Sequence, residues 1–118
     1  MLTDGSIKID VETLAGVTVL SVGGEIDLLT SPAFTQAILD VLAVDPPALV
    51  IDLTEVSFFS SAGISSLVAA REAMGDDSRF AVVPASSIAG RILEIAGLSD
   101  HLSVHRTRDA AVMAVRAN

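Results

Sequence analysis

Residues 51–64 read IDLTEVSFFSSAGI and combine three kinds of local sequence. The apolar run at residues 48–53, which leads into this stretch, is typical of a strand that is covered on both faces. A loop with two phenylalanines follows, and the pair Ser60 and Ser61 predicts the start of a helix. Unpaired backbone N–H groups and the positive end of the helix dipole meet at such a start, so a phosphate on a serine would be tolerated there. The alternative is that one of the two serines only caps the helix.

The sequence before this stretch predicts a β-hairpin and a helix. Apolar and charged residues alternate over residues 7–12, as in a half-exposed strand, and Ala15–Gly16 turns the chain into a second strand. The second strand is expected to end at Gly23–Gly24. Ser31 and Pro32 then predict a helix start, with Ser31 as the capping residue and Pro32 at the first helical position.

The sequence after this stretch predicts the end of the second helix and four further elements. The expected landmarks are a helix end at Gly75, a strand over residues 79–83, helix caps at Ser86 and Ser87, a short strand over residues 102–106 and a helix cap at Thr107. The element order β-β-α-β-α-β-α-β-α, in one domain over residues 1–118, predicts an α/β fold. We expect a mixed, mainly parallel β-sheet with an N-terminal hairpin and about four helices.

The composition excludes several classes of protein. The 118 residues carry a net charge of -8, are 51% hydrophobic and include no cysteine. A disulfide framework, a thiolate zinc site and a cysteine nucleophile are therefore excluded, and the acidic balance argues against a nucleic-acid partner. The uncharged stretch at residues 56–70 is too short to cross a bilayer, and no signal peptide is recognisable. A cytoplasmic protein without a membrane partner is expected.

Few residues suit the binding of a cofactor or a metal. Residues 22–25 lack the spacing of the glycine loops that bind phosphate. His101 and His105 lie four residues apart, but their neighbourhood offers too few further ligands for a metal site. We therefore expect no cofactor and no metal.

A small serine hydrolase is the enzymatic alternative. Residues 59–63 lie between a predicted strand and a predicted helix, which is where many such enzymes carry their nucleophile. The base would be His101 or His105, and the orienting acid would be Asp27 or Asp52. The segment departs from the GxSxG pattern, and the scarcity of catalytic residue types favours a protein that is not an enzyme.

Three parts of the chain resemble the STAS family, which is named for sulfate transporters and anti-sigma factor antagonists. One is Gly24-Glu25-Ile26-Asp27, which precedes the first predicted helix, and another is the stretch at residues 51–64. Gly97–Leu98, followed by a short strand and a terminal helix, is similar to the closing part of the family pattern. The length resembles that of the stand-alone bacterial antagonists.

The resemblance implies a regulatory binding protein. In the family, the serine two residues before the glycine of the second motif is phosphorylated, and here that serine is Ser61 before Gly63. Family members of this type bind an anti-sigma factor when unphosphorylated, and so free a sigma factor for transcription. The anti-sigma factor is often itself a serine kinase that phosphorylates the antagonist with ATP, and a metal-dependent serine phosphatase restores binding. A monomer or a weak dimer is expected.

The sequence departs from the family pattern beside the expected acceptor. Ser60 stands where an aspartate is usual, and Ala62 stands where a serine or threonine is common. Ser60 is therefore an alternative acceptor. The departures also leave open a STAS module that is not phosphorylated and binds a small molecule or a protein constitutively.

The resemblance also implies a partner-binding surface made of two loops and a helix start. Asp27 is expected near the acceptor, and Asp52 is expected as the acid at a strand end that supports the loop from beneath. The residues expected to contact the partner are Gly24, Glu25, Asp27, Ser60, Ser61, Ala62, Gly63 and Ile64.

Overall fold

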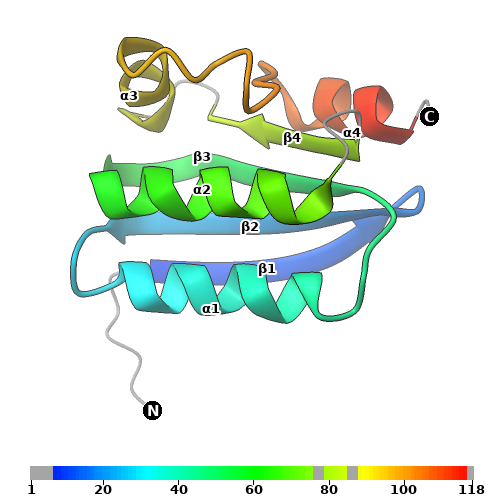
Figure 1. The fold of residues 1–118 in the computed structure, drawn as a ribbon, viewed down its shortest axis with the longest axis horizontal. Helices are drawn as coiled ribbons and strands as arrows, with labels where there is room; N and C mark the ends of the chain where they lie inside the picture. Colours follow the sequence, from blue (N-terminus) through cyan, green and yellow to red (C-terminus); the bar gives the residue numbers. More distant parts are fainter. Residues whose placement is uncertain (1–6, 76–78, 85–87, 117–118) are drawn as a thin grey trace.

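A computed structural model describes residues 7–75, 79–84 and 88–116 and shows a sheet with helices on both faces. Its strands are β1 (Ile7–Leu14), β2 (Val17–Ile26), β3 (Leu49–Phe59) and β4 (Phe80–Val83). Its helices are α1 (Ser31–Leu42), α2 (Ser61–Met74), α3 (Ile88–Ile95) and α4 (Arg108–Arg116). The strand order is β1-β2-β3-β4, with β1 antiparallel to β2 and the other neighbours parallel (Figure 1). The predicted fold class is confirmed.

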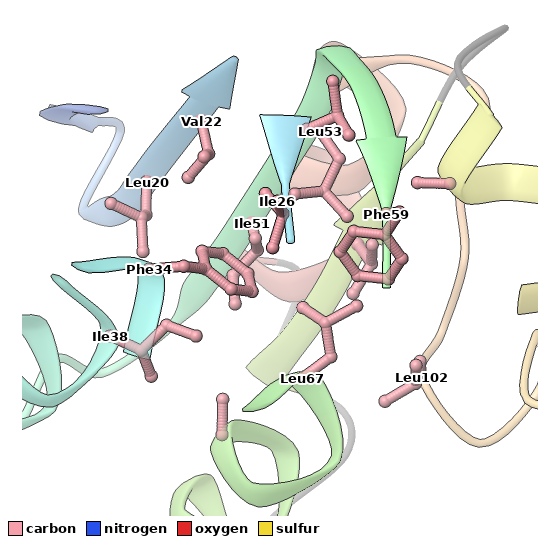
Figure 2. Close-up of a cluster of buried hydrophobic side chains, with 14 of the residues drawn as sticks. Leu20, Val22, Ile26, Phe34, Ile38, Ile51, Leu53, Phe59, Leu67 and Leu102 are labelled. Carbon is pink, nitrogen blue, oxygen red and sulfur yellow. The ribbon is translucent and has the colours of Figure 1, made fainter. Parts of the chain in front are cut away.

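The two faces of the sheet carry separate cores. The α1 and α2 helices lie side by side across one face (Figure 1), and the larger core between them and the sheet includes Leu20, Ile51, Phe34 and Leu67 (Figure 2). The α3 helix adds to the same core. The α4 helix covers part of the opposite face, where alternate strand residues form a smaller core. This division follows from the period of two along a strand, which sends successive side chains to opposite faces.

The hairpin turn forms where the sequence predicts it. Ala15 and Gly16 both have positive φ angles, 54° and 83°. Two residues with positive φ define a type I′ turn, whose twist matches that of the flanking strands. The register that follows places Ile7 opposite Gly24 and Leu14 opposite Val17.

The strands β2 and β3 are longer than the sequence predicts. The expected ends were Gly23–Gly24 for β2 and Leu53 for β3, whereas the observed ends are Ile26 and Phe59. Their parallel pairing continues through two register shifts to the last residue of each strand. Each extension supplies the backbone partner that the other needs, a tertiary contact that local pattern does not reveal.

The predicted caps of α1 and α4 can be compared with the structure. The N-cap of α1 is Thr30, and Ser31 is the first helical residue, so the prediction of Ser31 as the cap is wrong. The hydroxyl of Thr107 accepts a 3.0 Å hydrogen bond from the N–H of Ala110, as predicted for a cap of the final helix. The predicted caps Ser86 and Ser87 lie outside the described residues.

The short strand expected over residues 102–106 is reduced to one bridge. Val104 pairs in parallel with Val82 beyond the edge of β4. The preceding residues fold into turns instead, since the N–H of Leu102 donates to the carbonyl of Leu98 at 2.9 Å. In the described ranges, no helix has both the length and the apolar character that a membrane crossing requires.

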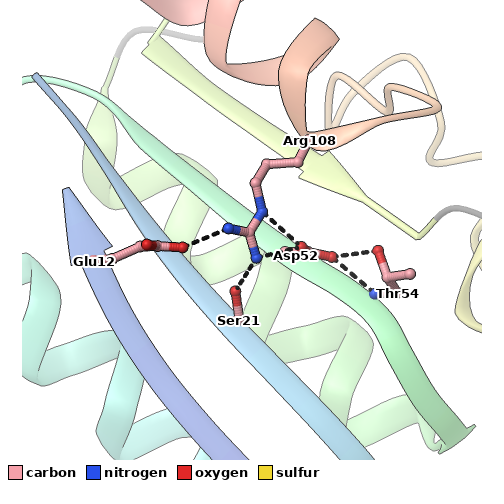
Figure 3. Close-up of polar contacts among 5 residues, drawn as sticks. All are labelled: Glu12, Ser21, Asp52, Thr54 and Arg108. Atoms are coloured by element: carbon pink, nitrogen blue, oxygen red, sulfur yellow. Dashed lines mark hydrogen bonds and ion pairs between the residues drawn. The ribbon is translucent and has the colours of Figure 1, made fainter. Parts of the chain in front are cut away.

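The α4 helix is attached to the sheet by a polar network (Figure 3). The Nε and Nη2 groups of Arg108, the first residue of α4, each donate to Oδ2 of Asp52 at 3.1 Å. Nη2 also donates to the hydroxyl of Ser21 at 2.9 Å, and Nη1 donates to Glu12. Asp52 is buried, with 7% of its surface exposed, and its Oδ1 accepts the N–H of Thr54 at 2.9 Å. One side chain of α4 thus bonds to three strands.

Replacing Arg108 is expected to destabilise the fold. Arg108→Ala leaves the buried Asp52 carboxylate without its charged partner, so we expect the free energy of unfolding to fall by about 1–2 kcal/mol. Urea unfolding measures this change. The matched control is Arg106→Ala, because Arg106 is exposed and lies two residues away. Equal midpoints for the two variants would contradict the role of the network.

Candidate functional site

Ser60 and Ser61 differ sharply in accessibility. Ser60 is the N-cap of α2, with φ −87° and ψ 170°, yet its side chain makes no capping hydrogen bond. Its Oγ is buried and has no hydrogen-bond partner among the described residues. Ser61 is the first residue of α2 and is exposed. Ser60 therefore occupies the N-cap position without a side-chain capping bond, and Ser61 is the exposed residue of the pair.

The backbone of Ser60 joins the two predicted loops. Its N–H donates to the carbonyl of Ile26 at 2.9 Å, which continues the pairing of β2 with β3 by one further bond. Its carbonyl accepts the N–H of Gly63 at 3.0 Å within the first turn of α2. The Gly24–Asp27 segment and the Ser60–Gly63 segment therefore lie together, as the resemblance implied.

Gly63 allows α2 to approach the sheet closely. A Cβ atom at this position would lie 2.7 Å from Cε1 of Phe59 and 3.1 Å from Cγ2 of Ile26. The Phe59 ring is itself held by an edge-to-face contact with Phe34, with centroids 6.4 Å apart (Figure 2). The first turn of α2 thus rests on a packed aromatic pair, which sets the position of Ser61.

The Asp27 carboxylate organises the loop between β2 and α1. Its Oδ1 accepts the N–H groups of Leu29 and Thr30 at 2.9 and 3.0 Å. The buried Thr30 hydroxyl donates to the carbonyl of Glu25 at 2.6 Å and accepts the N–H of Asp27 at 2.9 Å. The bond from the backbone N–H of Thr30 is the largest influence that holds the pKa of the Asp27 carboxyl below its ordinary value of 3.8. Asp27 is therefore a residue that shapes this loop.

This loop presents two leucines to solvent. Leu28 and Leu29 are 81% and 88% exposed, and Phe58 at the end of β3 is 49% exposed. A shallow hollow of about 340 Å³ is bordered by these three side chains together with Asp27 and Ser60. Exposed large apolar side chains that gather at one place commonly mark an interaction site. Ser61 directly follows Ser60 in the chain, and we call Ser61, Asp27, Leu28, Leu29 and Phe58 the Ser61 surface.

The sequence analysis did not single out the three apolar members of this surface. Leu28 and Leu29 directly follow an aspartate and fit neither a strand nor a helix period. This pattern could have indicated that the two side chains are exposed. Phe58 was placed in a loop, where its exposure could not be predicted. Its position in β3, opposite Glu25, turns it away from the core.

The other residues expected to contact the partner differ in their exposure to solvent. Glu25 is exposed, and Gly24 and Ala62 are half-buried. Ile64 packs against the larger core, so most of its side chain faces inward. The exposed surface therefore includes only some of the residues that were expected to contact the partner.

The expected position of Asp52 is corrected by the structure. Because β3 continues to Phe59, Asp52 lies within the strand and not at its end. Asp52 lies seven residue steps before Phe59 in the strand, which corresponds to about 23 Å. Its carboxylate bonds to Arg108 and Thr54 on the α4 face, so it stabilises the fold and does not support the Ser60–Gly63 loop (Figure 3).

The arrangement around Ser60 does not fit a hydrolase. An activated serine needs a base within hydrogen-bond reach, and Ser60 Oγ has no partner of any kind in the described part of the chain. His101 is exposed in a turn, and the N–H of His105 donates to Val82 at the far end of that turn. In the same part of the chain, no group of three or more potential ligands could hold a metal ion.

The site thus combines an exposed serine at a helix start with nearby exposed apolar side chains, an arrangement that suits the binding of another protein. Comparison with known proteins agrees, since the STAS domain matches residues 8–111. The chain therefore belongs to the STAS domain family, and the predicted resemblance is confirmed.

Individual relatives are regulators of sigma factors. The chain is 40% identical over 116 residues to the anti-sigma-F factor antagonist RsfB of Mycobacterium tuberculosis, with 98% of this chain and 95% of RsfB covered. A crystal structure of an anti-sigma factor antagonist from Mycobacterium paratuberculosis is 42% identical, with a TM-score of 0.90 and coverage of 98% and 99%. The Bacillus cell fate determinant SpoIIAA in its phosphorylated form shares the fold at 15% identity, with a TM-score of 0.64 and coverage of 94% and 100%.

The similarity to these proteins decides between a regulatory protein and an enzyme. The relatives are regulatory proteins, which confirms the prediction that the chain is not an enzyme. The serine hydrolase alternative is accordingly not pursued.

The Asp27 loop is expected to respond to acid. Since the folded pKa of Asp27 is depressed, the carboxylate holds the loop above the ordinary value of 3.8, and the loop loosens as the pH falls through the folded pKa. An NMR titration of the Leu29 and Thr30 amides should give a midpoint below 3.8. In the control Asp27→Asn, the two amides should lose this transition. A midpoint at or above 3.8 in the unaltered protein would contradict the assignment.

Proposed function

We propose that this protein binds an anti-sigma factor through the Ser61 surface, and that phosphorylation of Ser61 ends the binding. The observation that carries the proposal is the exposure of Ser61 at the start of α2, beside three exposed apolar side chains. The names of the similar proteins support the partner, since RsfB is an anti-sigma-F factor antagonist. In this role the protein acts in the cytoplasm, as a monomer or a weak dimer, and its partner carries the kinase activity and the ATP.

Accessibility favours Ser61 over Ser60 as the acceptor. A kinase must bring the γ-phosphate of ATP in line with the attacking hydroxyl. The Ser60 hydroxyl is buried beneath its own loop, whereas Ser61 is exposed. Phosphorylation of Ser60 would first require the N-cap of α2 to open.

The position of Ser61 explains how a phosphate would act on the partner and not on the fold. At the N-terminus of α2, backbone N–H groups and the helix dipole stabilise a negative charge. The apolar side chains of Leu28, Leu29 and Phe58 lie at the same surface. A partner that buries them would also have to desolvate about two negative charges, which is costly. A serine phosphatase that removes the phosphate would restore binding.

The fold is compatible with this switch. SpoIIAA, which shares the fold, has been solved in both an unphosphorylated and a phosphorylated form. A STAS module that binds its partner constitutively is the alternative, and the following experiment separates the two.

Charge at Ser61 is expected to control affinity. Ser61→Ala should keep the affinity for a purified candidate anti-sigma factor, because it removes only an exposed hydroxyl. Ser61→Glu should weaken binding by about tenfold or more, since it places a charge in a desolvated contact. Isothermal titration calorimetry measures both.

The same substitutions at Ser60 test whether Ser61 is the residue that receives the phosphate. Mass spectrometry after incubation with the kinase partner and ATP should find the phosphate on Ser61, and Ser60→Ala should leave its incorporation unchanged. Wild-type affinity in Ser61→Glu would contradict the switch and favour constitutive binding. Phosphate on Ser60 alone would contradict the acceptor assignment.

The leucine pair is expected to supply much of the binding energy. Leu29→Ser should weaken partner binding by about tenfold, because it replaces a large apolar side chain of the proposed interface with a small polar one and so removes apolar area that binding would bury. Its stability should change little, since Leu29 is 88% exposed. Met113→Ser is the matched control, because Met113 is 64% exposed on α4, which covers the other face of the sheet. Equal affinities of the two variants would exclude Leu29 from the interface.

A further inference from the structure

The first strand leaves one edge of the sheet open in the described part of the chain. The β1 strand spans Ile7–Leu14 and pairs only with β2 within that part. Its side chains alternate, so that Ile9 and Val11 are 41% and 52% exposed on the α1 face and Lys8 and Asp10 are exposed on the other. An edge with unpaired backbone groups is a template for another strand.

The sequence of β1 is complementary to itself in the antiparallel direction. If a two-fold axis normal to the sheet passes through Ile9, this residue faces Ile9 of a second copy. Lys8 then faces Asp10 and, by symmetry, Asp10 faces Lys8, which forms two cross-strand charge pairs. Ile7 and Val11 face each other in the same way, on the face that carries Ile9. In this register every charged side chain faces one of opposite charge, and every apolar side chain faces another apolar side chain.

The neighbouring registers are unfavourable. An axis through Asp10 would place its carboxylate against itself, and an axis through Lys8 would do the same with two ammonium groups. An axis through Val11 would set Asp10 against Glu12, which already bonds to Arg108. Like charges directly opposite each other destabilise a strand pair, and a shift by one residue would oppose apolar to charged side chains. The axis through Ile9 is therefore preferred.

We propose that two copies of this chain form a weak dimer through their β1 edges, with Ile9 on the two-fold axis. The pairing also explains an apolar groove of about 420 Å³ between β1 and α1, whose lining includes Ile9, Val11, Val41 and Val44. An axis normal to the sheet keeps the helices of both copies on the same face, so the two grooves meet across the new strand pair. Val44, which is 75% exposed, lies at this border.

The dimer is compatible with partner binding. Antiparallel pairing turns the two copies in opposite directions, so their Ser61 surfaces point away from each other along the strands. The five pairs from Ile7 to Val11 are few, which limits the affinity and makes the dimer dependent on concentration. The inference is independent of the proposed function, because it involves none of the residues of the Ser61 surface.

Charge reversal tests the pairing with the full chain. Lys8→Glu alone sets two acidic residues opposite each other, and Asp10→Lys alone sets two basic residues opposite each other. Each variant alone should dimerise about tenfold more weakly than the unaltered chain, while an equimolar mixture should regain the dimer, because both charge pairs are then opposite in sign. Sedimentation velocity over a concentration series up to about 1 mM measures this.

Cross-linking tests the register. The chain has no cysteine, so single cysteines are unambiguous. Ile9→Cys should cross-link efficiently with a short bis-maleimide, since directly opposed Cβ atoms lie about 5 Å apart. Thr13→Cys is the control, because it is exposed on the same strand and its two copies would be offset by about 26 Å.

Three results would overturn the dimer or its register. The unaltered chain could remain monomeric up to about 1 mM, which would exclude the dimer. The mixture of charge variants could dimerise no better than either variant alone, which would exclude the two charge pairs. Thr13→Cys could cross-link as efficiently as Ile9→Cys, which would exclude the axis through Ile9.

Discussion

The parallel pairing of β2 with β3 as far as Ile26 and Phe59 is the contact on which the functional surface depends. It brings together two loops that are far apart in the chain, and the N–H of Ser60 extends it by one bond to Ile26. Gly63 then allows α2 to pack closely against the Phe59 ring, because a Cβ atom at position 63 would collide with that ring. The exposed position of Ser61 and its closeness to the Asp27 loop both follow from these contacts.

Two separate regions of the fold contribute to stability and to the proposed regulation. On the α4 face, Arg108 and the buried Asp52 join a helix to three strands. At the C-terminal end of β3, Leu28, Leu29 and Phe58 gather beside Ser60, and the proposed acceptor Ser61 follows directly in the chain. The chain already carries a net charge of -8, so a phosphate changes the overall charge little and must act through its position. Under the proposed function, the protein is the substrate of another protein's kinase and needs no catalytic groups of its own.

Features that depend on neighbouring residues in the chain were predicted well. The hairpin turn at Ala15–Gly16, the cap at Thr107 and the start of α2 rest on local backbone preferences, and each is present. The cap of α1 was misplaced by one residue, because Thr30 and Ser31 both suit the position. The strand ends were misplaced further, since a strand continues as long as a neighbouring strand supplies hydrogen bonds.

The amino-acid sequence alone determined the α/β fold, the family and the segment that carries the proposed acceptor, because periodicity and short motifs are properties of adjacent residues. The tertiary structure decided which serine is accessible, since the Ser60 hydroxyl is buried and Ser61 is exposed. It also decided that Asp52 serves the α4 face and that Leu28, Leu29 and Phe58 gather beside Ser60. Burial and proximity depend on strand pairing and helix packing, which join residues distant in sequence.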